Sequence, residues 1–179
     1  EKYSDLPFSK NEVYNISSLF DKSKVYTGMQ AGEPNLMELS YSGILKKYKY
    51  IHFATHGKID LDQPEKSAIV MSLRDPSDYQ GDGFITVEEI NELDLNGNIV
   101  TLSACQTKAG KKYGTEGAIG LNEAFLSAGA RGVCSTLWKI ADKPTSLFMQ
   151  RLYAKISEGT DYRTALSQTK RDFLNGNYG

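Results

Sequence analysis

The segment Thr101-Leu102-Ser103-Ala104-Cys105-Gln106-Thr107 decides how the rest of this 179-residue chain is interpreted. An apolar run at 98–102 leads into it and has the branched residues typical of a buried strand. The turn pair Asn96-Gly97 comes just before that run. The sequence therefore predicts a strand that carries Cys105 just beyond its carboxyl end.

The composition indicates one well-buried domain, since 40% of the residues are hydrophobic and the length suits a single core. The net charge of -1 provides no bulk attraction to nucleic acid or to a membrane surface, so we expect neither as a partner. No apolar run is long enough to span a bilayer. The two cysteines make no disulfide framework and lie in apolar surroundings, which predicts a cytoplasmic protein.

Predicted strands and helices alternate along the chain. Apolar or branched runs predict strands at 24–27, 48–54, 67–73, 98–102 and 132–138. Helical spacing predicts helices at about 11–20, 34–45, 86–93, 121–128, 149–156 and 162–173, and Ser9/Glu12 and Thr86/Glu89 have capping-box spacing. Parallel strands need crossover connections that bury both sheet faces. This order predicts an α/β fold with a mostly parallel central sheet and helices on both sides.

Two histidines are available to assist Cys105. In parallel α/β folds, ligands bind beyond the carboxyl ends of the strands, and both His56 and Cys105 fall there. His52 lies well inside its predicted strand, so we assign it to packing. His56 lies at the strand end and is followed by Gly57. His56 is therefore the better base.

The chemistry of a cysteine nucleophile explains why these residue types matter together. Attack on an amide carbonyl requires the thiolate, so an imidazole must hold or remove the thiol proton. The glycine at 57 lets a substrate backbone approach, and the amides of Gly57 and Cys105 can point at a developing oxyanion. From the residues alone, His56 and Cys105 are candidates for a catalytic pair, while a packing role is the commoner one for a cysteine that ends a strand.

Structural alternatives remain open for these residues. A cysteine that ends a strand is often a small buried apolar residue, and we assign Cys134, in mid-strand, to that class. Two histidines and two cysteines could also suggest zinc. Their spacings lack the close ligand pairs of structural zinc sites, so we expect no metal and no other cofactor.

Three segments together resemble the CHAT family of caspase-like peptidases, named for caspases and HetF associated with tetratricopeptide repeats. They are YIHFATHG at 50–57, IVTLSACQT at 99–107 and TEGAIGLNEAFLSAGARGVCSTLWKIADKPT at 115–145. The resemblance covers nearly the whole chain and implies a caspase-like three-layer α/β/α sandwich. It also implies that the THG histidine, His56, and the SAC cysteine, Cys105, form the catalytic dyad. Their numbers differ by 49, close to the roughly 50 residues expected in caspases.

The resemblance implies a cysteine endopeptidase that cleaves selected polypeptides through an acyl-enzyme and uses no cofactor. It also implies activation by tetratricopeptide repeats or another sensor region, in the same protein or in a partner. Ser103 and Thr107 replace the Gln and Gly of the caspase signature, which argues against assuming cleavage after aspartate. The alternative is a catalytically silent scaffold or interaction domain. Intact residues at 56, 57 and 105 favour the enzyme.

Trp138, at the end of the last predicted strand, and Asp142, just after it, are candidates for substrate binding. Trp138 either walls a substrate pocket or covers the core. Asp142 is either the N-cap of the next helix, with Pro144 in its first turn, or a carboxylate that selects basic side chains, as the similar stretch of separases suggests. The glycine-containing, basic segment 108–114 is either an ordinary solvated loop or a loop that orders on activation.

CHAT domains generally have a strand before the Leu6-Pro7 element and a Trp-containing strand after the last helix. Neither is present here. We therefore expect residues 1–179 to be a single caspase-like domain from a longer protein, without the terminal strands of the full domain. The sheet would then have an unpaired edge that favours self-association.

Overall fold

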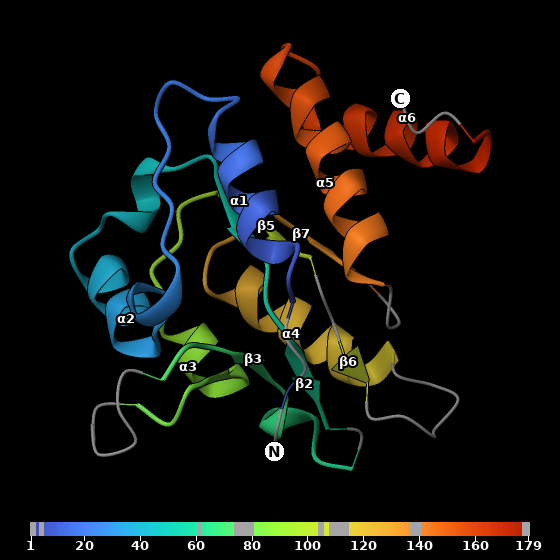
Figure 1. The fold of residues 1–179 in the computed structure, drawn as a ribbon. Coiled ribbons are helices and arrows are strands. Elements are labelled where there is room, and N and C mark those ends of the chain that lie inside the picture. The colour runs from blue at the N-terminus through green and yellow to red at the C-terminus, as the bar shows by residue number, and fades with distance from the viewer. Residues whose placement is uncertain are drawn as a thin grey trace. The chain divides into compact units, whose positions relative to one another are not determined.

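The computed structural model of the chain describes residues 3, 6–60, 62–73, 81–103, 106–107, 115–136 and 141–176, with backbone only at 106–107 and 115–118. The chain forms two compact units (Figure 1). The first combines Glu1–Val25 with Ala141–Gly179, and the second is Tyr26–Ile140. Segments from the two ends of the sequence thus fold together in the first unit.

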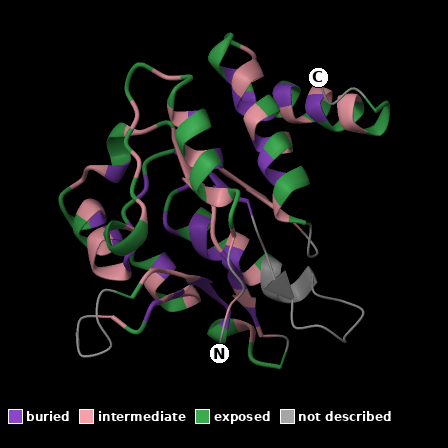
Figure 2. Cartoon of the chain, in the orientation of Figure 1, coloured by how far each residue is buried: buried purple, intermediate pink, exposed green. Residues whose placement is uncertain are grey.

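The described part of the first unit contains the helices α1 (Ser9–Ser17), α5 (Asp142–Ser157) and α6 (Tyr162–Leu174). Helix α5 packs against both α1 and α6. Its buried residues recur every three to four positions between exposed ones, as the sequence predicts (Figure 2). Tyr153 of α5 links the segment that follows α1 to the start of α6, because its ring meets those of Phe20 and Tyr162 edge-on at 6.2 and 6.4 Å.

The start of α1 differs from the prediction. The helix begins at Ser9, its N-cap is Phe8, and no side chain caps it. The hydroxyl of Ser9 instead donates to the Leu6 carbonyl at 2.8 Å, and Glu12 is buried with 1% exposure. The predicted Ser9/Glu12 capping box is therefore wrong. The predicted strand at 24–27 is also wrong, since these residues have no regular structure.

A three-stranded parallel sheet lies at the centre of the second unit. Its strands are β1 (Tyr50–Phe53), β5 (Ile99–Leu102) and β7 (Gly132–Ser135), in the order β1-β5-β7. Phe53 lies beside Leu102, and Leu102 beside Ser135, so the three carboxyl ends meet at one edge. The predicted mixed α/β class with a parallel sheet is confirmed.

A second sheet has the strand order β4-β3-β2-β6. Its strands are β2 (Gly57–Ile59), β3 (Ala68–Val70), β4 (Phe84–Thr86) and β6 (Gln106–Thr107). Strand β2 pairs in parallel with β6, whereas β3 is antiparallel to both β2 and β4. Ala68 and Ile69 point to opposite faces of β3 and are 1% and 3% exposed. Both faces of this strand are therefore buried, and its pairing is antiparallel.

The helices of the second unit follow most of the sequence signals. They are α2 (Glu33–Tyr41), α3 (Val87–Asn91), α4 (Thr115–Ser127) and the short 3-10 helices η1 (Gly28–Ala31), η2 (Leu45–Lys47) and η3 (Pro64–Lys66). Pro34 lies in the first turn of α2, as predicted, but the helix ends near Tyr41 rather than at about residue 45. The Thr86/Glu89 capping box of α3 is formed: the Glu89 amide donates to the Thr86 hydroxyl at 3.3 Å, and the Thr86 amide donates to the Glu89 carboxylate at 2.7 Å.

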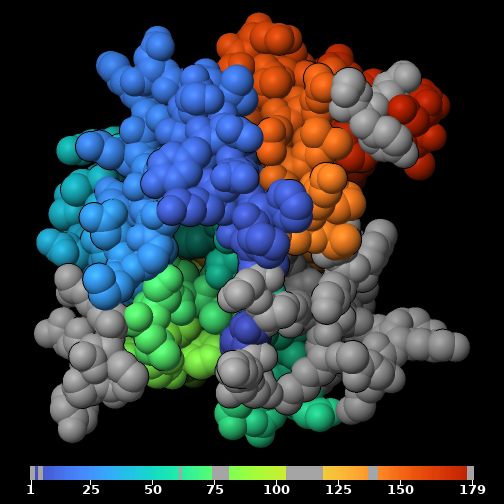
Figure 3. All heavy atoms as spheres, viewed as in Figure 1, coloured from blue at the N-terminus to red at the C-terminus, as the bar shows by residue number. Residues whose placement is uncertain are grey.

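Helix α2 is tied to the segment that leads into β4, and the two adjoin on the surface (Figure 3). The Asp82 amide donates to the Glu33 carboxylate at 3.1 Å. Burial, with the neighbouring Glu89 and Asp82 carboxylates, raises the pKa of Glu33. This contact fixes one side of the second sheet to the helix that precedes β1.

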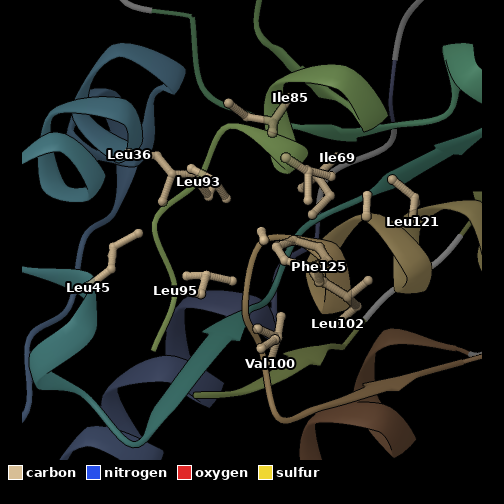
Figure 4. Packing of buried hydrophobic residues seen from close by; sticks show 14 of the residues in the cluster. Leu36, Leu45, Ile69, Ile85, Leu93, Leu95, Val100, Leu102, Leu121 and Phe125 are labelled. Carbon is tan, nitrogen blue, oxygen red and sulfur yellow. The ribbon is translucent and has the colours of Figure 1, made fainter. Parts of the chain in front are cut away.

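The core of the second unit lies between α4 and the two sheets. Leu121 and Phe125 of α4 pack with Val100 and Leu102 of β5 and with Ile69 of β3 (Figure 4). The apolar spacing predicted for α4 is therefore its buried face. Close packing in this cluster holds β5 and β3 against α4.

Candidate active site

His56 lies where the chain passes from the parallel sheet into the second sheet. Strand β1 ends at Phe53, the chain bends at Thr55, and β2 begins at Gly57. The amide of Val70 in β3 donates to the His56 carbonyl at 2.8 Å, and the Thr55 hydroxyl donates to the Val70 carbonyl at 2.6 Å. His56 is only 6% exposed. It is therefore a buried histidine on a segment held by β3.

A small, mainly apolar pocket adjoins this segment. It is lined by Phe53, Thr55, His56, Gly57, Ile69, Leu102 and Leu121. Phe53 and Leu102 are the last residues of β1 and β5, so the pocket lies at the carboxyl ends of these neighbouring strands. The predicted position of His56, beyond a strand end in a parallel α/β fold, is thus what the structure shows.

The chain on either side of Cys105 is paired with the chain on either side of His56. The Ser103 amide donates to the Phe53 carbonyl at 2.9 Å, three residues before His56. Gln106 is the partner of Lys58 in the parallel β6–β2 pair, two residues after His56. Cys105 itself lies outside the described residues.

The start of β5 is fixed by a buried polar residue. Asn98 is 1% exposed, and its amide nitrogen donates to the carbonyls of Leu45 and Tyr48. Its side-chain oxygen accepts the Asn96 amide at 3.0 Å. A buried amide with these hydrogen bonds locks the turn before β5 and hence the register in which β5 enters the sheet.

Asp142 is the first residue of α5 in the first unit. The N-cap of α5 is Ala141, and no side chain caps the helix, so the N-cap alternative for Asp142 is wrong. Its carboxylate instead accepts the backbone amide of Phe8, at the start of α1, at 2.8 Å. The role in substrate selection stays a prediction. Trp138 and the segment 108–114 lie outside the described residues.

His52 and Cys134 lie in mid-strand, as predicted. Each is paired with Thr101 of β5. All three residues lie one position before the last residue of their strand. Side chains alternate between the faces of a strand, so His52, Thr101 and Cys134 share the face opposite to that of Phe53, Leu102 and Ser135. His52 and Cys134 are therefore distinct in position from the residues that line the pocket.

The sequence did not reveal two polar contacts at this edge of the sheet. One is the Thr55 bond to Val70. The other joins α4 to β7, where the Asn122 amide nitrogen donates to the Ser135 hydroxyl at 3.0 Å. Both contacts link residues more than ten positions apart, so no local pattern identifies them. The only available signal was the place of Thr55 directly before the candidate histidine.

Within the described ranges, no three or more His, Cys, Asp or Glu side chains come together to hold a metal ion. None of the helices in these ranges is long and apolar enough to cross a membrane.

A parallel sheet with helices and a pocket at its carboxyl edge define a mixed α/β domain, and this architecture is consistent with the caspase-like fold. The sequence profile of the CHAT domain matches residues 2–178, and the chain belongs to this family. Human tetratricopeptide repeat protein 28 is 24% identical over 198 aligned positions, which cover 94% of this chain. The mouse protein of the same name is 23% identical over 198 positions and 94% of this chain. The chain spans 8% of the length of these relatives.

Proposed function

We propose that this CHAT domain is a cysteine endopeptidase in which Cys105 is the nucleophile and His56 the general base. The supporting observation is the pairing around the two residues. Ser103 is bonded to Phe53, and Gln106 is paired with Lys58. Only two residues of chain separate Ser103 from Gln106, and only four separate Phe53 from Lys58. The residues before and after the cysteine are therefore paired with residues before and after His56.

In the proposed reaction, His56 accepts the proton of the Cys105 thiol, and the sulfur attacks the carbonyl carbon of a peptide bond. The resulting tetrahedral intermediate collapses as His56 donates its proton to the leaving amine, which breaks the C–N bond. A water molecule, deprotonated by His56, then attacks the thioester. The C–S bond of the thioester then breaks, which releases the carboxylic acid product, and His56 returns the proton to the sulfur of Cys105.

Gly57 is the second residue to which we assign a role, that of stabilising the oxyanion. It is buried at the start of β2 and lines the pocket beside His56. Its amide, together with that of Cys105, would stabilise the oxyanion of the tetrahedral intermediate. Because glycine has no side chain, the carbonyl of a substrate can approach the backbone closely here.

The substrates in this proposal are selected polypeptides, and no metal or organic cofactor takes part. Trp138 and Asp142 would contribute to their selection. The names of the two relatives include tetratricopeptide repeats, which supports activation by such a repeat or another sensor region, in the same protein or in a partner. We place this activity in the cytoplasm.

Labelling with a peptide-based, thiol-directed probe tests the nucleophile, with intact-protein and peptide mass spectrometry as the measurement. The wild-type chain and Cys134→Ala should take up one probe molecule at Cys105, and Cys105→Ala should take up none. Cys134 is the matched control because it is the other cysteine of the chain and lies in mid-strand on β7. Labelling that persists in Cys105→Ala would overturn the assignment. A wild-type chain that is never labelled would favour the silent scaffold.

A further inference from the structure

We propose that Thr55 is a positioning residue, which sets the place of His56 by tying the histidine segment to β3. The inference rests on the proposed function, in which His56 exchanges protons with the nucleophile and the leaving group. It adds a residue whose role is to hold the base rather than to touch the substrate. The evidence is the way in which a single residue of β3 binds the two residues of this segment.

Both backbone groups of Val70 are used by the histidine segment. Its amide donates to the His56 carbonyl at 2.8 Å, and its carbonyl accepts the Thr55 hydroxyl at 2.6 Å. Two bonds from one residue to two consecutive residues fix both the position and the direction of the segment. The Thr55 bond adds to the ladder that begins at Gly57 and extends the attachment to β3 back to the residue before His56.

The Thr55 hydroxyl also explains where the ladder ends. Gly57 and Lys58 pair with Ile69 and Ala68 in the antiparallel β2–β3 ladder, and the next position along brings His56 opposite Val70. A hydrogen-bonded pair in such a ladder normally exchanges two backbone bonds between the same two residues. Here the Val70 carbonyl receives a side-chain hydroxyl. The backbone can therefore bend at Thr55 and return to β1 while the Val70 carbonyl stays satisfied.

Position matters for a general base more than for most residues. His56 is 6% exposed, so its surroundings leave few alternative placements once the segment is fixed. A base that is displaced by about 1 Å can lose on the order of 100-fold in rate. Removal of the hydroxyl would leave the Val70 carbonyl without this bond and loosen the bend that precedes His56.

The test compares Thr55→Val, which keeps the shape and loses the hydroxyl, with Thr55→Ser, which keeps the hydroxyl. Thr169→Val is the matched control, because the Thr169 hydroxyl also donates to a backbone carbonyl, that of Ala165 at 2.8 Å, in the first unit. The first measurement is the NMR spectrum of histidine labelled at its imidazole carbons. The chain has two histidines, so a His52→Asn variant assigns both signals.

We expect Thr55→Val to shift or broaden the His56 signal while leaving that of His52 in place. Thr55→Ser and Thr169→Val should give the wild-type spectrum. In the second measurement, the labelling rate of Cys105 by the peptide probe should fall about 10- to 100-fold in Thr55→Val and recover in Thr55→Ser. If Thr55→Val does not fold, Thr55→Ser carries the test, and a displaced His56 signal in it would contradict the proposal.

The two proposals fail in different ways. An unchanged His56 signal and an unchanged labelling rate in folded Thr55→Val would overturn the positioning role of Thr55. Wild-type protein whose Cys105 is not labelled would overturn the proposed function instead. In that case the NMR comparison would still decide whether Thr55 positions His56.

Discussion

The Asp142 carboxylate is engaged at the junction of α1 and α5 within the first unit. It accepts the Phe8 amide at 2.8 Å, and Phe8 is the N-cap of α1. A carboxylate near a helix start is favoured there because the unsatisfied amides carry partial positive charge. Asp142 thus has a defined structural contact whether or not it also selects substrates.

Replacement of Asp142 by Asn separates these two roles. We expect the free energy of unfolding to fall by about 1 kcal/mol, since the hydrogen bond loses its charged acceptor. If Asp142 also lines the specificity pocket, the preference for Lys or Arg before the cleaved bond should disappear. Urea unfolding and a peptide series with Lys, Arg and Leu at that position measure the two effects.

Asp161→Asn is the control for this prediction. Asp161 is the N-cap of α6 in the same unit, and its carboxylate accepts the Thr164 amide at 3.1 Å. This variant should change stability only. A stability loss in Asp142→Asn with an unchanged preference for basic residues would end the pocket hypothesis.

At the scale of elements, the end of α4 depends on one glycine. Gly129 has a positive φ of 101°, and a Cβ there would collide with the carbonyl oxygen of Leu95. The same region carries two backbone bonds, from the Leu95 amide to Ala128 and from the Gly97 amide to Gly129. The turn before β5 and the end of α4 are therefore built together.

Gly129→Ala should lower the free energy of unfolding by about 2–4 kcal/mol, because left-handed strain and a backbone collision add. Gly159→Ala is the matched control. Gly159 has a φ of 96°, yet a Cβ there would meet nothing within 4 Å. It should cost only about 1 kcal/mol. Thermal or urea unfolding measures both, and equal losses would show that the contact with Leu95 is not what matters.

The elements show which local signals could be interpreted from sequence alone. Two capping-box patterns were predicted, and Thr86/Glu89 is formed while Ser9/Glu12 is not. Spacing alone cannot distinguish them, because the choice depends on where the helix begins. At Ser9 the hydroxyl binds Leu6, so the helix starts without a side-chain cap.

The parts of the candidate site that directly follow a single apolar strand could be predicted from the sequence. His56 follows β1 and Ser103 follows β5, as the apolar runs predict. The second sheet was harder to predict, because β2, β4 and β6 have only three, three and two residues. Such short strands form only because they pair with others, so their antiparallel pairing and the Thr55 contact do not follow from local sequence.

At the scale of the whole molecule, the candidate catalytic groups and the candidate specificity carboxylate belong to different units. His56, Gly57 and both described neighbours of Cys105 lie in the second unit, whereas Asp142 lies in the first. In the proposed mechanism, the dyad is thus assembled from elements of one unit. Changes to His56 should therefore affect the reactivity of Cys105 directly.

The central claim is that His56 activates Cys105, and the rate constant for labelling of Cys105 by the peptide probe tests it most directly. The comparison is between wild type, His56→Asn and His52→Asn, the last serving as control because His52 is the other histidine and lies within β1. We predict that His56→Asn slows labelling by about 100-fold or more, the usual contribution of a general base, and that His52→Asn reacts like wild type. Labelling of His56→Asn at the wild-type rate would contradict the account.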